Sequence, residues 1–176
     1  MSKKQRYALN KNKYLLEHEY DRLIHILKSF INKDKRNCVM IYLALFTGAR
    51  AQEILNITID DLDSYDEVIY IKGLKGSNDR EIPLPSWLFK ECLKLSPEQG
   101  KLFPITYNRL LQIWHLYRPV AKKFHSLRHT FAIRLYKKTK DIRLVQVALG
   151  HRNITNTMVY ADYVYTQQEM RRLILL

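Results

Sequence analysis

The side chains best suited to chemistry lie between His125 and Tyr160, in three short segments of the sequence. His125 and Arg128 are three residues apart where apolar residues recur at helical spacing, so both project from one face of a helix. His151 follows a glycine that stands where a left-handed residue would end the preceding helix. Tyr160 lies nine residues further on, in a third helical segment. Two histidines, an arginine and a tyrosine brought together in this way favour chemistry on a phosphate group.

The elements that must position these residues are mostly helices. A chain of 176 residues with 47% hydrophobic residues, five glycines and five prolines fits one globular, mainly helical domain with a sizeable core. Two β-type runs flank a turn at 73–79 and predict a hairpin. We therefore expect an α+β fold, mainly α-helical with a small antiparallel sheet. Helical spacing predicts helices over 17–31, 36–47 (the central core helix), 51–55, 87–95, 106–117, 141–149 and 154–163, and the two β-type runs predict strands over 68–72 and 80–84.

The charge predicts a polyanionic partner. Thirty Lys and Arg against seventeen Asp and Glu leave a net charge of +13 and a pI near 9.7, which makes nucleic acid the leading candidate. Nine cations and a single acid, Asp141, fall between 118 and 143, beside the His125 and Arg128 pair. The residues expected to contact DNA are Lys122, Lys123, Arg134 and Arg152.

Other classes of protein and site are disfavoured. Two cysteines, Cys38 and Cys92, are too few for a disulfide framework or a zinc knuckle, and no apolar run approaches the roughly 20 residues of a membrane span. We expect a cytoplasmic protein without cofactor. His125 and His129 have the spacing of half a zinc site, but Arg128 between them would repel a cation. We expect no metal, and His129 should pack against or orient its neighbours.

Two more candidates lie upstream. Arg50 projects from a glycine turn after the core helix, and Glu53 follows one helical turn later. Alone, this spacing also fits a surface ion pair worth a few tenths of a kcal/mol. Lys75 stands at the tip of the expected hairpin, where a lysine is usually only solvated.

Taken in order, these residues resemble the motifs of the tyrosine recombinases, also called phage integrases, which share their catalytic domain with type IB topoisomerases. The resemblance covers nearly the whole chain. It is carried by Thr-Gly-Ala-Arg with Arg50, Gly-Leu-Lys-Gly with Lys75, His-Ser-Leu-Arg-His with His125 and Arg128, Leu-Gly-His with His151, and Tyr160.

The resemblance implies a role for each residue that physical chemistry also supports. Arg50 and Arg128 would stabilise the charge that builds on the nonbridging oxygens of a phosphodiester, because guanidinium groups are always charged and bind phosphate through two N–H groups. His151 would donate to another phosphate oxygen, and His125 would exchange the proton of the Tyr160 hydroxyl.

Tyr160 would attack the phosphate and hold the DNA 3′ end covalently, so that neither ATP nor metal is required. Lys75 would protonate the departing 5′ oxygen, and Glu53 would act through Arg50 by holding it in place. Tyr163 and Tyr165 are close enough in sequence to be rival nucleophiles.

For domain organisation, we expect a flexible basic arm over 1–13 and a tyrosine recombinase catalytic domain over 14–176, without the N-terminal core-binding domain usual in the family. The apolar end over 166–176 either packs on its own core or docks on a neighbouring subunit, which would support a homotetramer on DNA. The activity that the resemblance implies is site-specific recombination of double-stranded DNA. The alternatives are DNA relaxation, as by a type IB topoisomerase, or a DNA-binding regulator that has lost catalysis.

Overall fold

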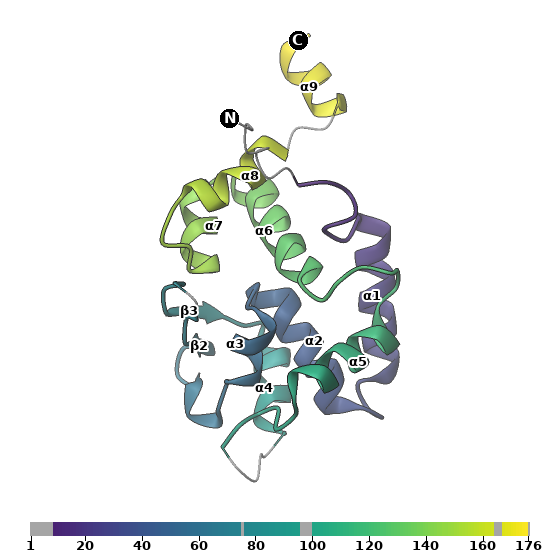
Figure 1. The fold of residues 1–176 in the computed structure, drawn as a ribbon, viewed down its shortest axis with the longest axis vertical. Coiled ribbons are helices and arrows are strands. Elements are labelled where there is room, and N and C mark those ends of the chain that lie inside the picture. The colour runs from purple at the N-terminus through teal and green to yellow at the C-terminus, as the bar shows by residue number, and fades with distance from the viewer. Residues whose placement is uncertain (1–8, 75, 96–99, 164–166, 176) are drawn as a thin grey trace, which may run out of the picture.

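The computed structural model of the chain describes residues 9–74, 76–95, 100–163 and 167–175 (Figure 1). Most of this part of the chain is helical, with a small sheet at one side, which confirms the predicted fold class. The helices are α1 (Glu17–Phe30), α2 (Lys35–Thr47), α3 (Ala51–Leu55), α4 (Ser86–Leu93), α5 (Tyr107–Tyr117), α6 (Ser126–Thr139), α7 (Ile142–Leu149), α8 (Thr155–Tyr163) and α9 (Gln167–Ile174). None of the helices formed by these residues is long and apolar enough to cross a membrane.

Helix α2 is the centre of the main core, as its sequence predicts. It packs against α1, α3, α4 and α6, and nearly all of its side chains are buried, including Tyr42 at 2% exposure. A helix that is apolar on every side can only be stable inside such a ring of neighbours. The Cys38 and Cys92 side chains are free thiols buried in this core.

The sheet has three antiparallel strands in the order β1 (Leu62–Asp63), β2 (Val68–Ile71) and β3 (Arg80–Pro83). Ile69 pairs with Ile82, and both are buried on the face turned to the core. The segment before β2 is rich in acidic residues, and one of them, Asp61, is buried. Asp61 is buried because its carboxylate accepts the backbone N–H and the hydroxyl of Thr58, closing a 3₁₀ turn (Ile59–Asp61) that leads into β1.

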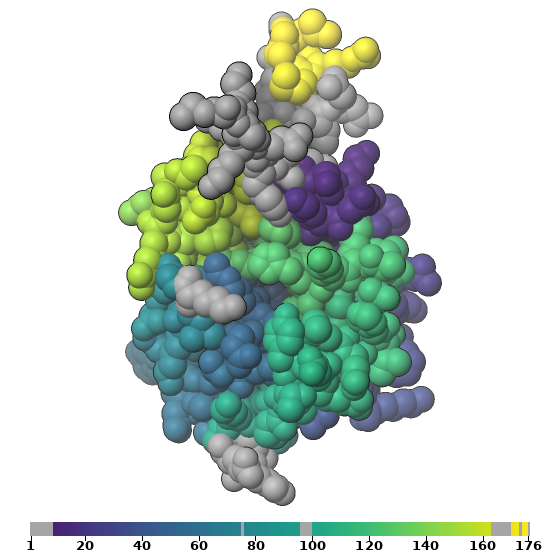
Figure 2. Space-filling model, in the orientation of Figure 1, coloured from purple at the N-terminus to yellow at the C-terminus, as the bar shows by residue number. Residues whose placement is uncertain are grey.

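A second apolar cluster joins α6, α7 and α8 at the other end of the molecule (Figure 1). The space-filling view in Figure 2 shows the N-terminal segment lying against α6 at this end. Leu9 and Tyr14 belong to this cluster and are buried. Residues 9–13 were expected in a flexible arm, but the apolar side chain of Leu9 ties this stretch to the body. The rest of that arm, residues 1–8, lies outside the described residues.

Helix α9 stands away from the body in Figure 1. Ile174 is 67% exposed and Leu175 is 77% exposed, so neither packs on the protein's own core. At these two described side chains, the structure therefore does not show packing of the apolar end within the same chain.

Candidate active site

Arg50 is held by a turn that only glycine accommodates. Gly48 ends α2 with φ +63°, a left-handed conformation, and a Cβ atom there would overlap the ring of Phe131 on α6. The turn can thus press directly against α6. Arg50 then begins α3, and its backbone N–H donates to the Glu53 carboxylate at 2.9 Å. Its guanidinium group donates to the hydroxyl of Ser77 in the hairpin.

Arg128 is buried at 2% exposure and joins two helix ends. One terminal nitrogen donates to the carbonyl of Gly48 at 2.6 Å, and the other donates to the carbonyl of Leu149 at 2.9 Å. Carbonyls at helix C-termini lack partners inside their own helix, so Arg128 satisfies one from α2 and one from α7. These bonds fix the guanidinium group between the turns that carry Arg50 and His151.

His151 is positioned by the contact between the α7 turn and the hairpin. Gly150 has φ +69°, and its carbonyl accepts the backbone N–H of Asn78 at 2.8 Å. A Cβ atom on Gly150 would lie 2.6 Å from the Asn78 carbonyl oxygen, so any larger residue would push the hairpin away. The His151 ring is oriented by its Nδ1, which lies 3.0 Å from the hydroxyl of the fully buried Thr157.

Arg80 is a member of the site that sequence reasoning missed. The side chains of Arg80 and Glu53 are 2% and 0% exposed, and they form an ion pair at 2.8 Å. The Arg80 Nε also donates to the Ala148 carbonyl at 2.9 Å. Glu53 was expected to hold Arg50, and it does contact Arg50 at 3.4 Å, but its shorter ion pair is with Arg80. The available signal was an arginine at the first position of a predicted strand.

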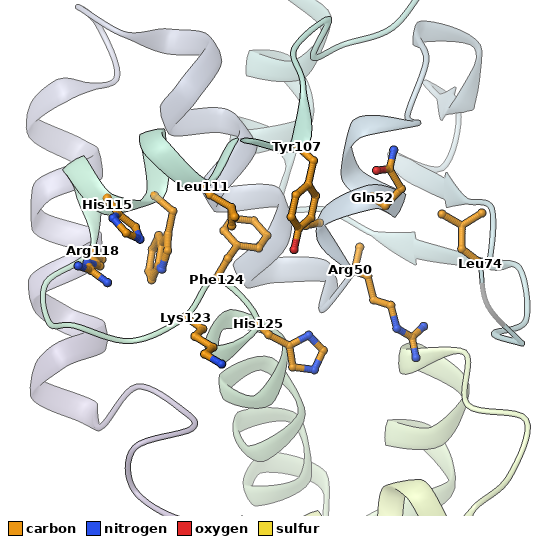
Figure 3. Close-up of a pocket in the computed structure, with 13 residues that line it drawn as sticks. Arg50, Gln52, Leu74, Tyr107, Leu111, His115, Arg118, Lys123, Phe124 and His125 are labelled. Carbon is orange, nitrogen blue, oxygen red and sulfur yellow. The ribbon is translucent and has the colours of Figure 1, made fainter. Parts of the chain in front are cut away.

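Arg50 and His125 point into the same open cavity of about 440 Å³ (Figure 3). Its floor is apolar, with Leu111, Trp114 and Phe124 among the lining side chains. The charged and imidazole side chains among the described lining residues are Arg50, His115, Arg118, Lys123 and His125, with no carboxylate. The cavity is therefore suited to an anion that also has apolar surface.

The pKa values of the site reflect burial first and the excess of positive charge second. Partial removal from water, followed by the charges of Arg128 and Arg50, lowers the pKa of His125 to about 4. The same causes in the same order lower the pKa of His151 to about 4. Burial lowers the pKa of Arg128 to about 9, and the positive charges of Arg50 and Arg80 contribute to this shift after burial. Burial alone would raise the pKa of Glu53, but its hydrogen bond and ion pair with Arg80 bring it below its usual value. A bound anion would relieve this repulsion.

Tyr160 is buried and is not among the described residues that line the cavity. Its side chain is 2% exposed, and its hydroxyl oxygen is 2.9 Å from Nδ1 of His129. His129 in turn meets His125 edge to face, with ring centroids 4.7 Å apart. His129 thus contacts both Tyr160 and His125, as expected of a residue that orients its neighbours.

The four expected DNA contacts differ in their surroundings. Lys123 and Arg152 are exposed, and Lys123 lines the cavity. Lys122 was a poor choice, because it is 9% exposed and its ammonium group donates to the Glu19 carboxylate and the Tyr14 carbonyl. Arg134 pairs with Glu17 and lies 3.8 Å above the Tyr20 ring, on a different hollow of the surface.

Two further expectations concern Lys75 and a metal. Lys75 and the rival nucleophile Tyr165 lie outside the described residues. Within the part of the chain that the structure describes, no three or more His, Cys, Asp or Glu side chains are grouped in a way that could hold a metal ion.

Comparison with known proteins places this arrangement in a family. The sequence model of the phage integrase family matches residues 13–167. The chain belongs to the phage integrase family. The family resemblance inferred from the motifs is thereby confirmed.

Two relatives illustrate the match. A tyrosine recombinase of Pseudothermotoga lettingae is 34% identical over 166 residues, covering 86% of this chain and 56% of the relative. Tyrosine recombinase XerA of Pyrococcus furiosus is 32% identical over 167 residues, covering 84% of this chain and 56% of the relative. The chain spans little more than half the length of these relatives.

Solved structures show the same fold. The XerH recombinase bound to difH substrate in a post-cleavage complex matches 93% of this chain and 53% of its own, with a TM-score of 0.75 at 24% identity. The catalytic domain of bacteriophage HP1 integrase matches 93% of this chain and 95% of its own, with a TM-score of 0.67 at 25% identity. Similarity across almost all of the HP1 domain indicates that this family member has the fold of an integrase catalytic domain.

Proposed function

We propose that this family member is a site-specific DNA recombinase that cleaves and rejoins DNA strands through a 3′-phosphotyrosyl intermediate on Tyr160. The observation that carries the proposal is the convergence of Arg50, Arg128 and His151 on one cationic site. Three separate turns and helices bring them there, and burial together with the charges of Arg128 and Arg50 lowers the pKa of His151. Such a site is built for a phosphodiester, whose negative charge grows during attack.

Arg50 and Arg128 act as a clamp on the nonbridging oxygens. Arg128 is held by the carbonyls of Gly48 and Leu149, so its direction is fixed before DNA arrives. A donor that is already in place needs no reorganisation during the reaction. Glu53 and Arg80 act through this clamp. Glu53 contacts Arg50 and pairs with Arg80, and Arg80 in turn donates to the Ala148 carbonyl in α7. His151, with its ring set by Thr157, donates to the same phosphate.

Tyr160 supplies the oxygen that attacks phosphorus. Its proton passes to His125; His129 supports this transfer, since it lies 2.9 Å from the hydroxyl and meets the His125 ring edge to face. Lys75 protonates the 5′ oxygen that leaves, which the Gly73 to Asp79 turn would allow by bringing an ammonium group to the cavity. The ester keeps the energy of the broken bond for rejoining, so ATP and metal are not needed.

DNA binding would use the cationic face that includes Lys123 and Arg152. The net charge of +13 supports attraction to the phosphate backbone. Two recombining duplexes need four protomers, and the exposed apolar side chains of α9, such as Ile174, are proposed to dock on a neighbouring copy. The recombinases among its relatives favour recombination over simple DNA relaxation.

The test is a trapping assay with a nicked duplex from which the released fragment diffuses away. In EDTA and without ATP, the protein should form a denaturant-stable complex with the labelled strand. Tyr160→Phe should bind the duplex with unchanged affinity and form no complex. A Tyr160→Phe protein that still forms the complex would exclude Tyr160 as the nucleophile. DNA binding without a complex in the parent protein would favour a DNA-binding regulator.

A further inference from the structure

The hydroxyl of Ser126 is an exception among the buried polar groups. Ser126 is 2% exposed, and among the side chains that the structure describes its hydroxyl oxygen is the only buried nitrogen or oxygen without a hydrogen-bond partner. The Thr130 hydroxyl, one turn further along α6 and equally buried, donates to the Ser126 carbonyl and accepts the backbone N–H of Leu15. An unpaired buried hydroxyl costs stability, so its presence at Ser126 points to a ligand.

Ser126 lines a second cavity, of about 390 Å³, next to the cavity that Arg50 lines. Lys123 and His125 line both cavities, and Figure 3 shows them together at the start of α6. The second cavity is cationic, since no carboxylate is among its described lining residues and its charged and imidazole side chains are Lys13, Lys122, Lys123, His125 and His129. It therefore extends the positive surface beyond the site proposed for the reacting phosphate.

The start of α6 adds to this preference for an anion. Ser126 is the first residue of the helix, the preceding His125 provides no side-chain cap, and the first turn has no acidic residue. No side chain of that turn therefore offsets the positive end of the helix dipole. The backbone N–H groups of Ser126 and Leu127 already donate to the carbonyls of Lys123 and Phe124, at 2.9 Å and 3.0 Å, so a ligand has to be bound by side chains.

We infer that Ser126 and Lys123 form a second phosphate site, which binds the backbone phosphate next to the one held by Arg50 and Arg128. The Ser126 hydroxyl donates to an oxygen of this phosphate, and the Lys123 ammonium group offsets its charge. Neighbouring phosphates of one strand suit this arrangement, because His125 and Lys123 form a wall that the two cavities share. The inference rests on the proposed function and adds to it a subsite that fixes the strand on both sides of His125.

Thymidine oligonucleotides test the second site without any cleavage. A dinucleotide has one phosphodiester and a trinucleotide has two, and NMR titration of the backbone amides gives their dissociation constants. The parent should bind the trinucleotide about tenfold more tightly, the effect of one hydrogen bond to a charged group. A trinucleotide in which either linkage is a neutral methylphosphonate should bind like the dinucleotide, a comparison that needs no variant protein.

Ser126→Ala should lose most of this preference for the trinucleotide. Ser29→Ala is the matched control, because Ser29 is an exposed serine whose hydroxyl donates to the His25 carbonyl within α1, and it should bind as the parent does. Urea unfolding without nucleotide separates binding from a structural role. The unfolding midpoint of Ser126→Ala should lie at or above that of the parent, since the substitution removes an unpaired buried hydroxyl.

A parent without preference for the trinucleotide, or a Ser126→Ala variant that keeps the full preference, would overturn the inference. A lower urea midpoint of Ser126→Ala would also overturn it, because the hydroxyl would then serve the fold. So would a site that inorganic phosphate fills in the parent, and not in Ser126→Ala, while the trinucleotide gains nothing. None of these measurements involves cleavage, so their failure and a failure of the trapping assay are told apart.

Discussion

Replacing Glu53 by glutamine tests how the arginine clamp is held. The Glu53 side chain is fully buried, with Arg80 at 2.8 Å and Arg50 at 3.4 Å. It also accepts the backbone N–H groups of Arg50 and Leu74. Glu53→Gln keeps the shape of the side chain and removes its charge, leaving the buried guanidinium group of Arg80 without its ion-pair partner.

Breaking a buried ion pair by removing one partner lowers the free energy of unfolding by about 3 to 5 kcal/mol. Glutamine still offers one oxygen to Arg80, so we expect a loss near the lower end, about 3 kcal/mol. Glu91→Gln is the matched control, because Glu91 also pairs with two cations, Lys35 and Lys94, but at the surface. Its loss should stay below about 1 kcal/mol.

The assay is urea unfolding at pH 7.5, with the free energy of unfolding extrapolated to water for both variants and the parent. Sulfate should stabilise Glu53→Gln more than it stabilises the parent, since an anion can replace part of the missing charge. A Glu53→Gln protein within 1 kcal/mol of the parent would refute the argument that this carboxylate anchors the clamp.

Three further predictions use the same stability and binding assays. Gly150 and Gly100 both have a left-handed backbone, so alanine at either position costs about 1 to 2 kcal/mol of stability. The two variants differ in one contact: the new methyl group in Gly150→Ala would lie 2.6 Å from the carbonyl oxygen of Asn78. Gly150→Ala should therefore lower the free energy of unfolding more than Gly100→Ala does, and it should abolish nearly all DNA cleavage. Equal effects of the two substitutions would contradict the contact between Gly150 and the hairpin. The lowered pKa of His151, about 4 in the folded protein against about 6.5 unfolded, means that the unfolded state binds more protons between these values. The free energy of unfolding should thus fall as pH drops from 6.5 towards 5, less steeply in His151→Gln than in the parent or in His25→Gln; a flat profile would contradict the cationic cluster. DNA affinity should fall about a thousandfold between 50 and 200 mM salt, and a loss below tenfold would mean that few phosphates are contacted.

Much of the fold follows from local pattern. The helical spacing of α1, the apolar α2 and the glycine after α7 each predict the element found, because burial and chain reversal leave direct marks on residue type. Strand β1 could not be predicted in this way. It has two residues and exists only because Leu62 and Asp63 pair with β2, a tertiary contact that local propensity does not encode.

The sequence names candidate residues of the site but not all of them, and not the contacts between them. The motifs identify Arg50, Arg128 and His151, but their spacing does not reveal that Arg80 is the buried partner of Glu53. Lys122 was predicted to contact DNA, and the fold instead buries it. A lysine in a basic stretch of sequence indicates an exposed cation, and only the fold brings Glu19 and the Tyr14 carbonyl to its ammonium group.

The central claim is that Tyr160 attacks a DNA phosphate held by the Arg50 and Arg128 clamp. Its most direct test is peptide mapping, by mass spectrometry, of the complex trapped on a nicked duplex in EDTA. The account predicts a 3′-phosphoryl nucleotide on the peptide that contains Tyr160, and its absence from an Arg128→Ala protein that still binds the duplex. A nucleotide on Tyr163 or Tyr165, or none on any tyrosine while the duplex is bound, would contradict it.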